Sequence, residues 1–172
     1  MEIIALSVDS IKIKGKNTSV VVDPRLIKSK TEADAIVLLN ENQDYDLSKI
    51  ENQRLLIKGP GEYEFGGIKI SGLSCGDDIV YEMLIDGLKI ILGKAESIEK
   101  IKDKVGEHEV AVLKISSQFD QNLITAIEPR VAVFYGEKAQ EVDSNLKPVL
   151  KFATKSDKLP EELEKVILVA SN

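Results

Sequence analysis

The chain has 172 residues, 43% of them apolar and 30% charged, which is typical of a single folded domain spanning residues 1–172. Its net charge of −6 and its scattered lysines argue against nucleic-acid binding, which depends on Lys and Arg contacts with phosphates. It has no apolar run long enough to cross a bilayer, no evident signal peptide and one cysteine, so we expect a cytoplasmic protein with no membrane association and no intramolecular disulfide.

The first half of the chain consists of short apolar stretches separated by tight-turn sequences, which is typical of β-strands joined in hairpins. Asp86-Gly87, between two such stretches, is the strongest hairpin signal. The stretch Ile36–Leu39 is continuously apolar and branched, so we expect a strand buried on both faces. The other strands expected in this half are Glu2–Val8, Ile11–Lys14, Thr18–Val22, Arg54–Lys58, Tyr63–Phe65, Ile68–Ile70, Ile79–Ile85 and Leu88–Leu92.

The second half alternates helical and strand patterns. A helix is expected around Ile98, Ile101 and Val105, with Ser97 as its N-cap, and a second helix over Phe119–Ile127. Strands are expected at Val110–Ile115, Val131–Tyr135, Val149–Phe152 and Val166–Val169. This alternation implies crossover connections and parallel strands, so the predicted fold class is α/β (α+β mixed), a pair of mixed sheets flanked by helices.

A polar cluster, residues 40–46, directly follows the buried strand Ile36–Leu39. Side chains at the end of a buried strand are where α/β folds usually place their chemistry. The cluster contains amide, carboxylate and phenol groups but no imidazole, because His108 is the only histidine of the chain. At most one imidazole is therefore available as a base or a metal ligand in the whole protein.

Several short motifs occur in order along nearly the whole chain: Val21-Val22-Asp23-Pro24, Ala33-Asp34, Gly59-Pro60-Gly61-Glu62-Tyr63, Ile85-Asp86-Gly87-Leu88-Lys89-Ile90, Ile127-Glu128-Pro129-Arg130 and the stretch 157–162. Together they resemble the metallo-β-lactamase-fold superfamily, in particular its short bacterial proteins of the zinc-dependent-hydrolase type. The resemblance implies an αββα-type sandwich of two mixed β-sheets and, in active members, zinc-dependent hydrolysis.

The resemblance also implies where the metal ligands would lie, and this chain lacks nearly all of them. The His-x-His-x-Asp-His signature of the family falls on Asn40, Asn42, Asp44 and Tyr45. A third histidine, a bridging aspartate and a last histidine fall, in that order, near Gly76 or Asp77, on Lys94 and on Gly136. A hydrolytic zinc site needs about three strong ligands and one open position, so we expect a degenerate site with no metal, no cofactor and no catalytic residue.

The cleft left by such a site would still offer side chains to a ligand. Tyr45 and Tyr135 are expected at its rim, and with Lys94 they are the candidate cleft-binding residues. Asp23, just before Pro24, could be an active-site carboxylate, but we expect it to accept hydrogen bonds that fix its loop.

The loop after the central strand also fits part of a calcium-binding frame. Oxygen-bearing residues occupy positions 1, 3, 5, 7, 9 and 12 of that frame, namely Asn40, Asn42, Asp44, Asp46, Ser48 and Glu51. Tyr45 stands where the frame needs glycine, and a strand precedes the loop in place of a helix. We therefore favour a solvated loop over a calcium site.

Two other reactive residue types occur once each. Cys75 lies near Asp77 and Asp78, whose charges would raise the pKa of a thiol, so a structural role is expected. His108 lies between Glu107 and Glu109 and is expected to be a titrating surface residue.

The sequence thus predicts a catalytically inactive metallo-β-lactamase-fold protein, a pseudoenzyme that acts as a binding or assembly module. Its partner would be an unknown protein or a small ligand, and pairing of an exposed strand edge would give a homodimer. The alternative is a metal-dependent hydrolase whose altered site uses Asp44, Asp77 or Asp78 with a hard cation. A third interpretation is an unrelated α/β protein whose motifs match by chance.

Overall fold

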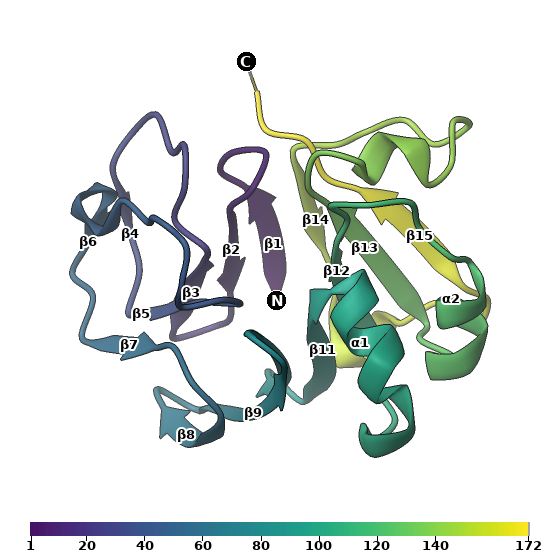
Figure 1. Ribbon diagram of the computed structural model, residues 1–172, viewed down its shortest axis with the longest axis horizontal. Helices are drawn as coiled ribbons and strands as arrows, with labels where there is room; N and C mark the ends of the chain where they lie inside the picture. The colour runs from purple at the N-terminus through teal and green to yellow at the C-terminus, as the bar shows by residue number, and fades with distance from the viewer. Residues whose placement is uncertain (172) are drawn as a thin grey trace.

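A computed structural model describes residues 1–171, which form two large β-sheets packed face to face (Figure 1). In the first sheet the strand order is β14-β1-β2-β3-β5-β7. Its strands are β1 (Glu2–Ala5), β2 (Ile11–Lys14), β3 (Ser19–Val22), β5 (Ala35–Val37), β7 (Leu55–Ile57) and β14 (Lys151–Ala153).

In the second sheet the strand order is β15-β13-β12-β11-β10-β9-β8. Its strands are β8 (Gly61–Phe65), β9 (Ile68–Cys75), β10 (Asp78–Ile85), β11 (Leu88–Lys94), β12 (Val110–Lys114), β13 (Val131–Tyr135) and β15 (Glu164–Ile167). A small parallel pair joins β4 (Thr31–Glu32) to β6 (Ile50–Glu51). The helical segments are α1 (Ala95–Ile101), α2 (Asn122–Ile127), η1 (Leu47–Lys49), η2 (Lys102–Lys104), η3 (Ala139–Glu141) and η4 (Ser156–Lys158).

The second sheet changes direction at β11. The hairpins β8–β9, β9–β10 and β10–β11 are antiparallel, whereas β11, β12, β13 and β15 run parallel. The register of the parallel strands pairs Lys94 with Lys114 and Lys114 with Tyr135. The carboxyl ends of three strands therefore bring two lysines and a tyrosine side by side at one edge of the sheet.

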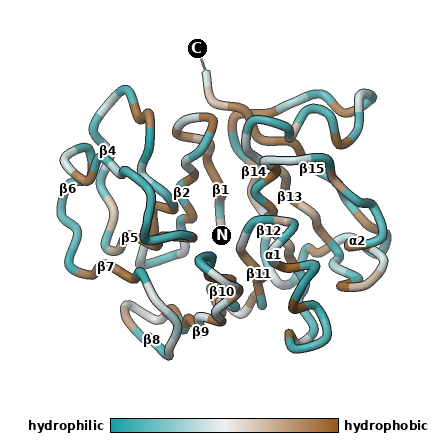
Figure 2. The backbone as a smooth tube through the Cα atoms, in the orientation of Figure 1, coloured by the Kyte–Doolittle hydropathy of each residue, from teal (hydrophilic) through white to brown (hydrophobic). Residues whose placement is uncertain are grey.

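Apolar side chains that alternate along the strands fill the space between the two sheets. Coloured by hydropathy, the backbone shows hydrophobic residues along the strands of both sheets (Figure 2). Helices α1 and α2 cover the outer face of the second sheet, where Ile98 and Leu123 pack against buried residues of β12 and β13. The outer face of the first sheet is covered by the segment that contains β4, η1 and β6. The predicted sandwich of two mixed sheets is confirmed.

Several bounds differ from the sequence prediction. Ser97 is not the N-cap of the first helix, because the helix begins at Ala95 and Lys94 is the cap residue, and the helix ends at Ile101, so Val105 lies outside it. The second helix begins at Asn122, where the Asp120 carboxylate accepts the Asn122 N–H at 2.9 Å, so residues 119–121 stay outside it. Strand β14 begins at Lys151, two residues later than predicted, and Val149 forms a bridge with Leu168, just after β15, instead. Over the described residues, no helix is both long and apolar enough to span a membrane.

Candidate functional site

The carboxyl ends of β5, β11, β12 and β13 meet the loops that follow β1 and β3, and at this meeting point lies a buried ion pair. The Lys114 ammonium at the end of β12 is 2.9 Å from Asp23 Oδ2 and 3.3 Å from Asp9 Oδ1. The side chains of Lys114 and Asp23 are 4% and 1% exposed. A buried carboxylate is tolerated only with a cation or several hydrogen bonds beside it, so Lys114 is a main stabilising partner of Asp23.

Asp23 also fixes the loop after β3. Its Oδ1 accepts the backbone N–H of Leu39, at the end of the central strand, at 2.8 Å. Its backbone has φ of +45°, a left-handed conformation that a residue other than glycine adopts at a cost. The predicted role of Asp23 as an acceptor is confirmed, and the structure adds the ion pair with Lys114.

Asp9 completes this cluster from the turn after β1. A second cation, the Arg25 guanidinium, lies 3.7 Å from Asp9 Oδ2 and donates to Gln43 Oε1 at 3.2 Å. Two carboxylates thus face two cations, and the charge of this deep cluster is balanced by side chains of the chain itself.

A second, shallower cluster surrounds Asp78 at the start of β10. Its Oδ1 accepts from the Lys94 ammonium at 2.7 Å and from Asn40 Nδ2 at 2.8 Å, and its Oδ2 accepts from Ser97 Oγ at 2.8 Å. Burial acts to raise the pKa of Asp78, but the hydrogen bonds from Lys94, Asn40 and Ser97 outweigh it and lower the pKa below its ordinary value. Asp78 therefore stays ionised and fully hydrogen-bonded.

Two phenols lie in the same region. Tyr45 is half-buried and donates its hydroxyl hydrogen to the carbonyl of Asn40, and burial, with the nearby charge of Asp23, raises its pKa. Tyr135 is buried and does not lie at an exposed rim as expected, because β13 is covered on both faces. Its hydroxyl has no hydrogen-bond partner among residues 1–171, and its pKa is raised by burial and then by the charges of Asp23 and Asp9.

The structure scatters the signature positions that follow the central strand. Asn40 points to Asp78, and its Oδ1 accepts the Asn42 backbone N–H at 2.9 Å. Asn42 and Asp44 are exposed. In the calcium frame, Asp46 accepts from the Ser48 N–H and Glu51 binds the Lys30 ammonium at 2.8 Å. These oxygen atoms are engaged in separate local contacts.

The later ligand positions include two glycines with positive φ. Gly76, exposed in the turn between β9 and β10, has φ of +64°, and Asp77 beside it is exposed. Gly136 has φ of +106°, and a Cβ atom there would lie 2.7 Å from the carbonyl oxygen of Ile115. Position 136 therefore has no room for any side chain, an imidazole included.

A zinc ion does not fit this arrangement. Within residues 1–171, no group of three or more His, Cys, Asp or Glu side chains is placed to hold a metal ion. Asp9 and Asp23 already share the Lys114 ammonium, and Asp78 holds the Lys94 ammonium. A metal ion would have to displace a bound ammonium and then find only oxygen donors.

The sequence prediction named Lys94, which the structure pairs with Asp78, but it did not include Lys114, Asp9, Arg25 or Ser97 among the site residues. The available signal was Lys114 itself, the only charged residue of an otherwise apolar strand that is buried along its whole length. A lone lysine at a buried strand end needs a carboxylate partner, which could have directed attention to the aspartates in the loops.

The expectation for His108 was wrong. Its side chain is buried, and its Nε2 lies 3.0 Å from Glu82 Oε1, although its neighbours Glu107 and Glu109 are exposed and half-buried, respectively. Burial lowers the pKa of His108, although Glu82 acts in the opposite direction. Cys75 is half-buried, and its thiol approaches the Ser97 carbonyl at 3.4 Å.

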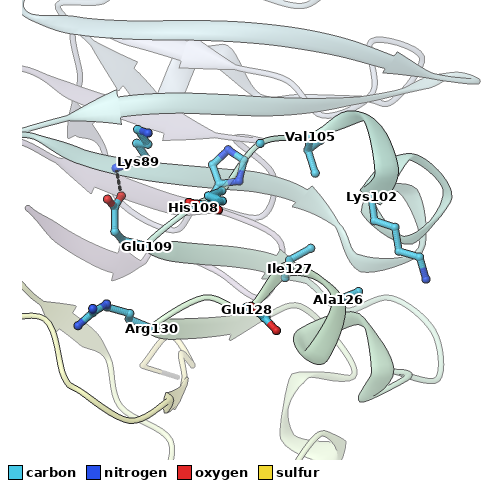
Figure 3. A pocket seen from close by; sticks show the side chains of 11 residues that line it. Lys89, Lys102, Val105, His108, Glu109, Ala126, Ile127, Glu128 and Arg130 are labelled. Carbon is cyan, nitrogen blue, oxygen red and sulfur yellow. Dashed lines mark hydrogen bonds between the residues drawn. The ribbon is translucent and has the colours of Figure 1, made fainter.

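Two cavities lie at opposite ends of the parallel strands. One, of about 310 Å³, lies beside Gly136 and the carboxyl end of β15, and the exposed apolar side chains of Val8 and Leu26 form part of its lining. The other, of about 620 Å³, lies at the amino ends of β11, β12 and β13 and carries charges of both signs, with Lys89, Glu109 and Arg130 on its walls (Figure 3). The lining of the first cavity includes Val8, which precedes Asp9 in the chain, and Gly136, which follows Tyr135.

Neither protein-family models nor curated protein sequences match this chain. Solved structures do. The chain is similar to a proposed zinc-dependent hydrolase of the metallo-β-lactamase superfamily from Thermotoga maritima, with a TM-score of 0.72 and 19% identity over 98% of both chains. It is also similar to a proposed metal-dependent hydrolase from Parabacteroides distasonis, with a TM-score of 0.67 and 18% identity over 98% of this chain and 93% of the other.

A third similar structure is an isothiocyanate hydrolase from Delia radicum gut bacteria, with a TM-score of 0.59 and 12% identity over 91% of this chain and all of the other. At such identities these likenesses concern the path of the backbone. They extend over nearly the whole chain.

Proposed function

Since the chain has the metallo-β-lactamase fold, we propose that it works without the hydrolytic metal centre of that fold, as a binding or assembly module. The observation that carries the proposal is that ammonium groups pair with the carboxylates at the carboxyl ends of β11 and β12. Asp23 holds Lys114 at 2.9 Å and Asp78 holds Lys94 at 2.7 Å, so these two carboxylates are already neutralised. Without a metal ion, no bound water acquires a pKa near neutrality there.

The alternative, a hydrolase with a carboxylate-based site, gains no support from the geometry. Asp78 already accepts three hydrogen bonds, Asp44 and Asp77 are exposed, and no group of three or more His, Cys, Asp or Glu side chains within residues 1–171 is placed to hold a metal ion. General base catalysis needs a carboxylate within hydrogen-bond reach of a substrate proton and free to accept it.

The binding role is supported by the surface beside the cleft. Leu26 is 67% exposed and has φ of +55°, a backbone conformation that costs energy for a leucine. It lines the 310 Å³ cavity together with Val8 and three apolar residues near the end of the described chain, Leu168, Val169 and Ala170. Exposed apolar surface around a cavity is typical of interaction sites, so we place the partner or ligand here.

Metal analysis and a hydrolysis panel test the absence of catalysis. We expect the purified protein to hold no stoichiometric transition metal and to leave ester and phosphodiester substrates intact when Zn²⁺ or Mn²⁺ is supplied. A stoichiometric metal together with turnover that is lost on chelation would overturn the proposal.

The binding half is tested by the variant Leu26→Asp against the matched control Leu163→Asp, which changes an equally apolar but distant leucine that is 43% exposed. We expect a partner recovered by affinity capture to be lost with Leu26→Asp only. Sedimentation of the same two variants shows whether that partner is a second copy of the chain. Equal loss in both variants would remove this cavity from consideration.

A further inference from the structure

We propose that Lys114 is a built-in replacement for a divalent cation, and that Asp9 and Asp23 form a latent cation site which its ammonium closes. The inference concerns the deep cluster alone and does not depend on the binding role proposed above. Pairing with the Lys114 ammonium accounts for the presence of two buried carboxylates at a site without imidazoles.

Two carboxylates converge on the Lys114 ammonium from separate loops. Asp9 comes from the turn after β1, Asp23 from the loop after β3, and Lys114 from the far sheet, 91 residues away from Asp23. Both carboxylates reach the same nitrogen atom, at 3.3 and 2.9 Å. Side chains from separate loops of one sheet thus meet on one point that belongs to the other sheet.

Without a positive charge at the position of the ammonium, the two carboxylates would be destabilised by burial. Asp23 is almost wholly buried, and its other oxygen is already used by the Leu39 N–H. Besides Lys114, the one cation within ion-pair distance of these carboxylates among residues 1–171 is Arg25, 3.7 Å from Asp9. If the ammonium is removed, two carboxylates remain together away from water, and they must take up a proton or a cation.

The hydroxyl of Tyr135 offers a third oxygen atom beside the two carboxylates. Tyr135 neighbours Lys114 in the register of the sheet, it is buried, and its hydroxyl lacks a partner among residues 1–171 while it feels the charges of Asp23 and Asp9. Two carboxylates and a phenol are oxygen donors. Such a set favours hard cations, so the latent site would take Mn²⁺ or Mg²⁺ in preference to Zn²⁺.

A pair of substitutions separates charge from volume. Lys114→Ala removes the ammonium and leaves room for an ion with its waters, whereas Lys114→Met removes the charge but fills the space of the stem. Each variant is titrated with Mn²⁺, with the free ion followed by electron paramagnetic resonance and stability followed by thermal unfolding.

We expect no stoichiometric Mn²⁺ binding and no shift of Tm in the unsubstituted protein. Both variants should unfold at a lower temperature, but only Lys114→Ala should bind Mn²⁺ stoichiometrically and regain Tm, and adding Asp23→Asn to it should abolish both effects. Binding by the unsubstituted protein, no binding by Lys114→Ala, or undiminished binding after Asp23→Asn would each overturn the proposal.

A variant without charges keeps the inference testable if Lys114→Ala fails to fold. The triple variant Asp9→Asn, Asp23→Asn, Lys114→Met removes the cation and both carboxylates together. Because the repulsive charges are then gone, it should unfold at a higher temperature than Lys114→Met alone. A further fall of Tm would show that Lys114 does not act by balancing these two charges.

Discussion

The two ammonium–carboxylate clusters of the cleft differ in depth. The pair formed by Lys114 and Asp23 is 4% and 1% exposed, whereas Lys94 and Asp78 are 15% and 18% exposed. If Lys114 is removed, the charge of Asp23 is left without an ion-pair partner and almost without access to water. If Lys94 is removed, Asp78 is still partly exposed to water and still accepts hydrogen bonds from Asn40 and Ser97. Two ion pairs with similar N···O distances can therefore differ in how much they stabilise the fold, and substitutions can measure the difference.

The largest effect is expected from Lys114→Met. Removing one partner of a buried ion pair leaves an uncompensated charge, so the free energy of unfolding should fall by about 3–5 kcal/mol. Denaturant unfolding measures it, with Lys94→Met as the matched control. An equal effect of the two substitutions would contradict the difference in depth.

Substitutions of Gly136 test whether the loop after β13 can accept a histidine. Gly136→Ala should lower the free energy of unfolding by about 1–3 kcal/mol through its left-handed backbone, with a further loss from the Cβ contact to the Ile115 carbonyl. Gly136→His should be at least as destabilised and should bind no zinc, as measured by denaturant unfolding and calorimetry. Unchanged stability of both variants would show that this loop adjusts freely.

Lys94→Met should cost about 1 kcal/mol, because the shallow cluster is partly screened by water. The pKa of Asp78 is lower in the folded chain than its ordinary value of 3.8, so this carboxylate adds stability above pH 3.8 that is lost as pH falls through the folded pKa. Lys94→Met should raise the folded pKa and flatten that acid loss. Parallel acid-unfolding curves for the two proteins would count against the assignment.

The smallest effect concerns His108, at the other end of the second sheet. Its pKa is lower in the folded chain than the ordinary 6.5, so burial of the neutral ring adds stability above pH 6.5 that is lost as pH falls through the folded pKa. His108→Gln should remove this loss, whereas Glu82→Gln should enlarge it. Unfolding free energies across this pH range, with an NMR titration of the imidazole, provide the measurement.

The fold could be predicted further than the site because its signals are local. Turns such as Asp86-Gly87 and Gly66-Gly67 specify hairpins by their own chemistry, and both have the positive φ values that such turns need. Continuous apolar stretches mark β12 and β13 as buried. The start of β14 could not be predicted, since Val149 and Leu150 are as apolar as the strand that follows.

The site depends on contacts between residues far apart in the sequence. The position of Lys94 followed from the resemblance, but the pairing of Lys114 with Asp23 joins residues 91 positions apart, and no local pattern announces it. His108 was misplaced for a related reason. Its glutamate neighbours suggest a surface turn, whereas its burial depends on Glu82 in the adjoining β10 hairpin.

A crystal structure of the unsubstituted protein soaked in Mn²⁺ or Zn²⁺, with anomalous difference maps at the absorption edge, tests the central claim most directly. The account predicts Lys114 Nζ between Asp9 and Asp23, Lys94 Nζ on Asp78, and no anomalous peak in the cleft. A peak within coordination distance of Asp23 or Asp78, with either lysine displaced, would contradict it.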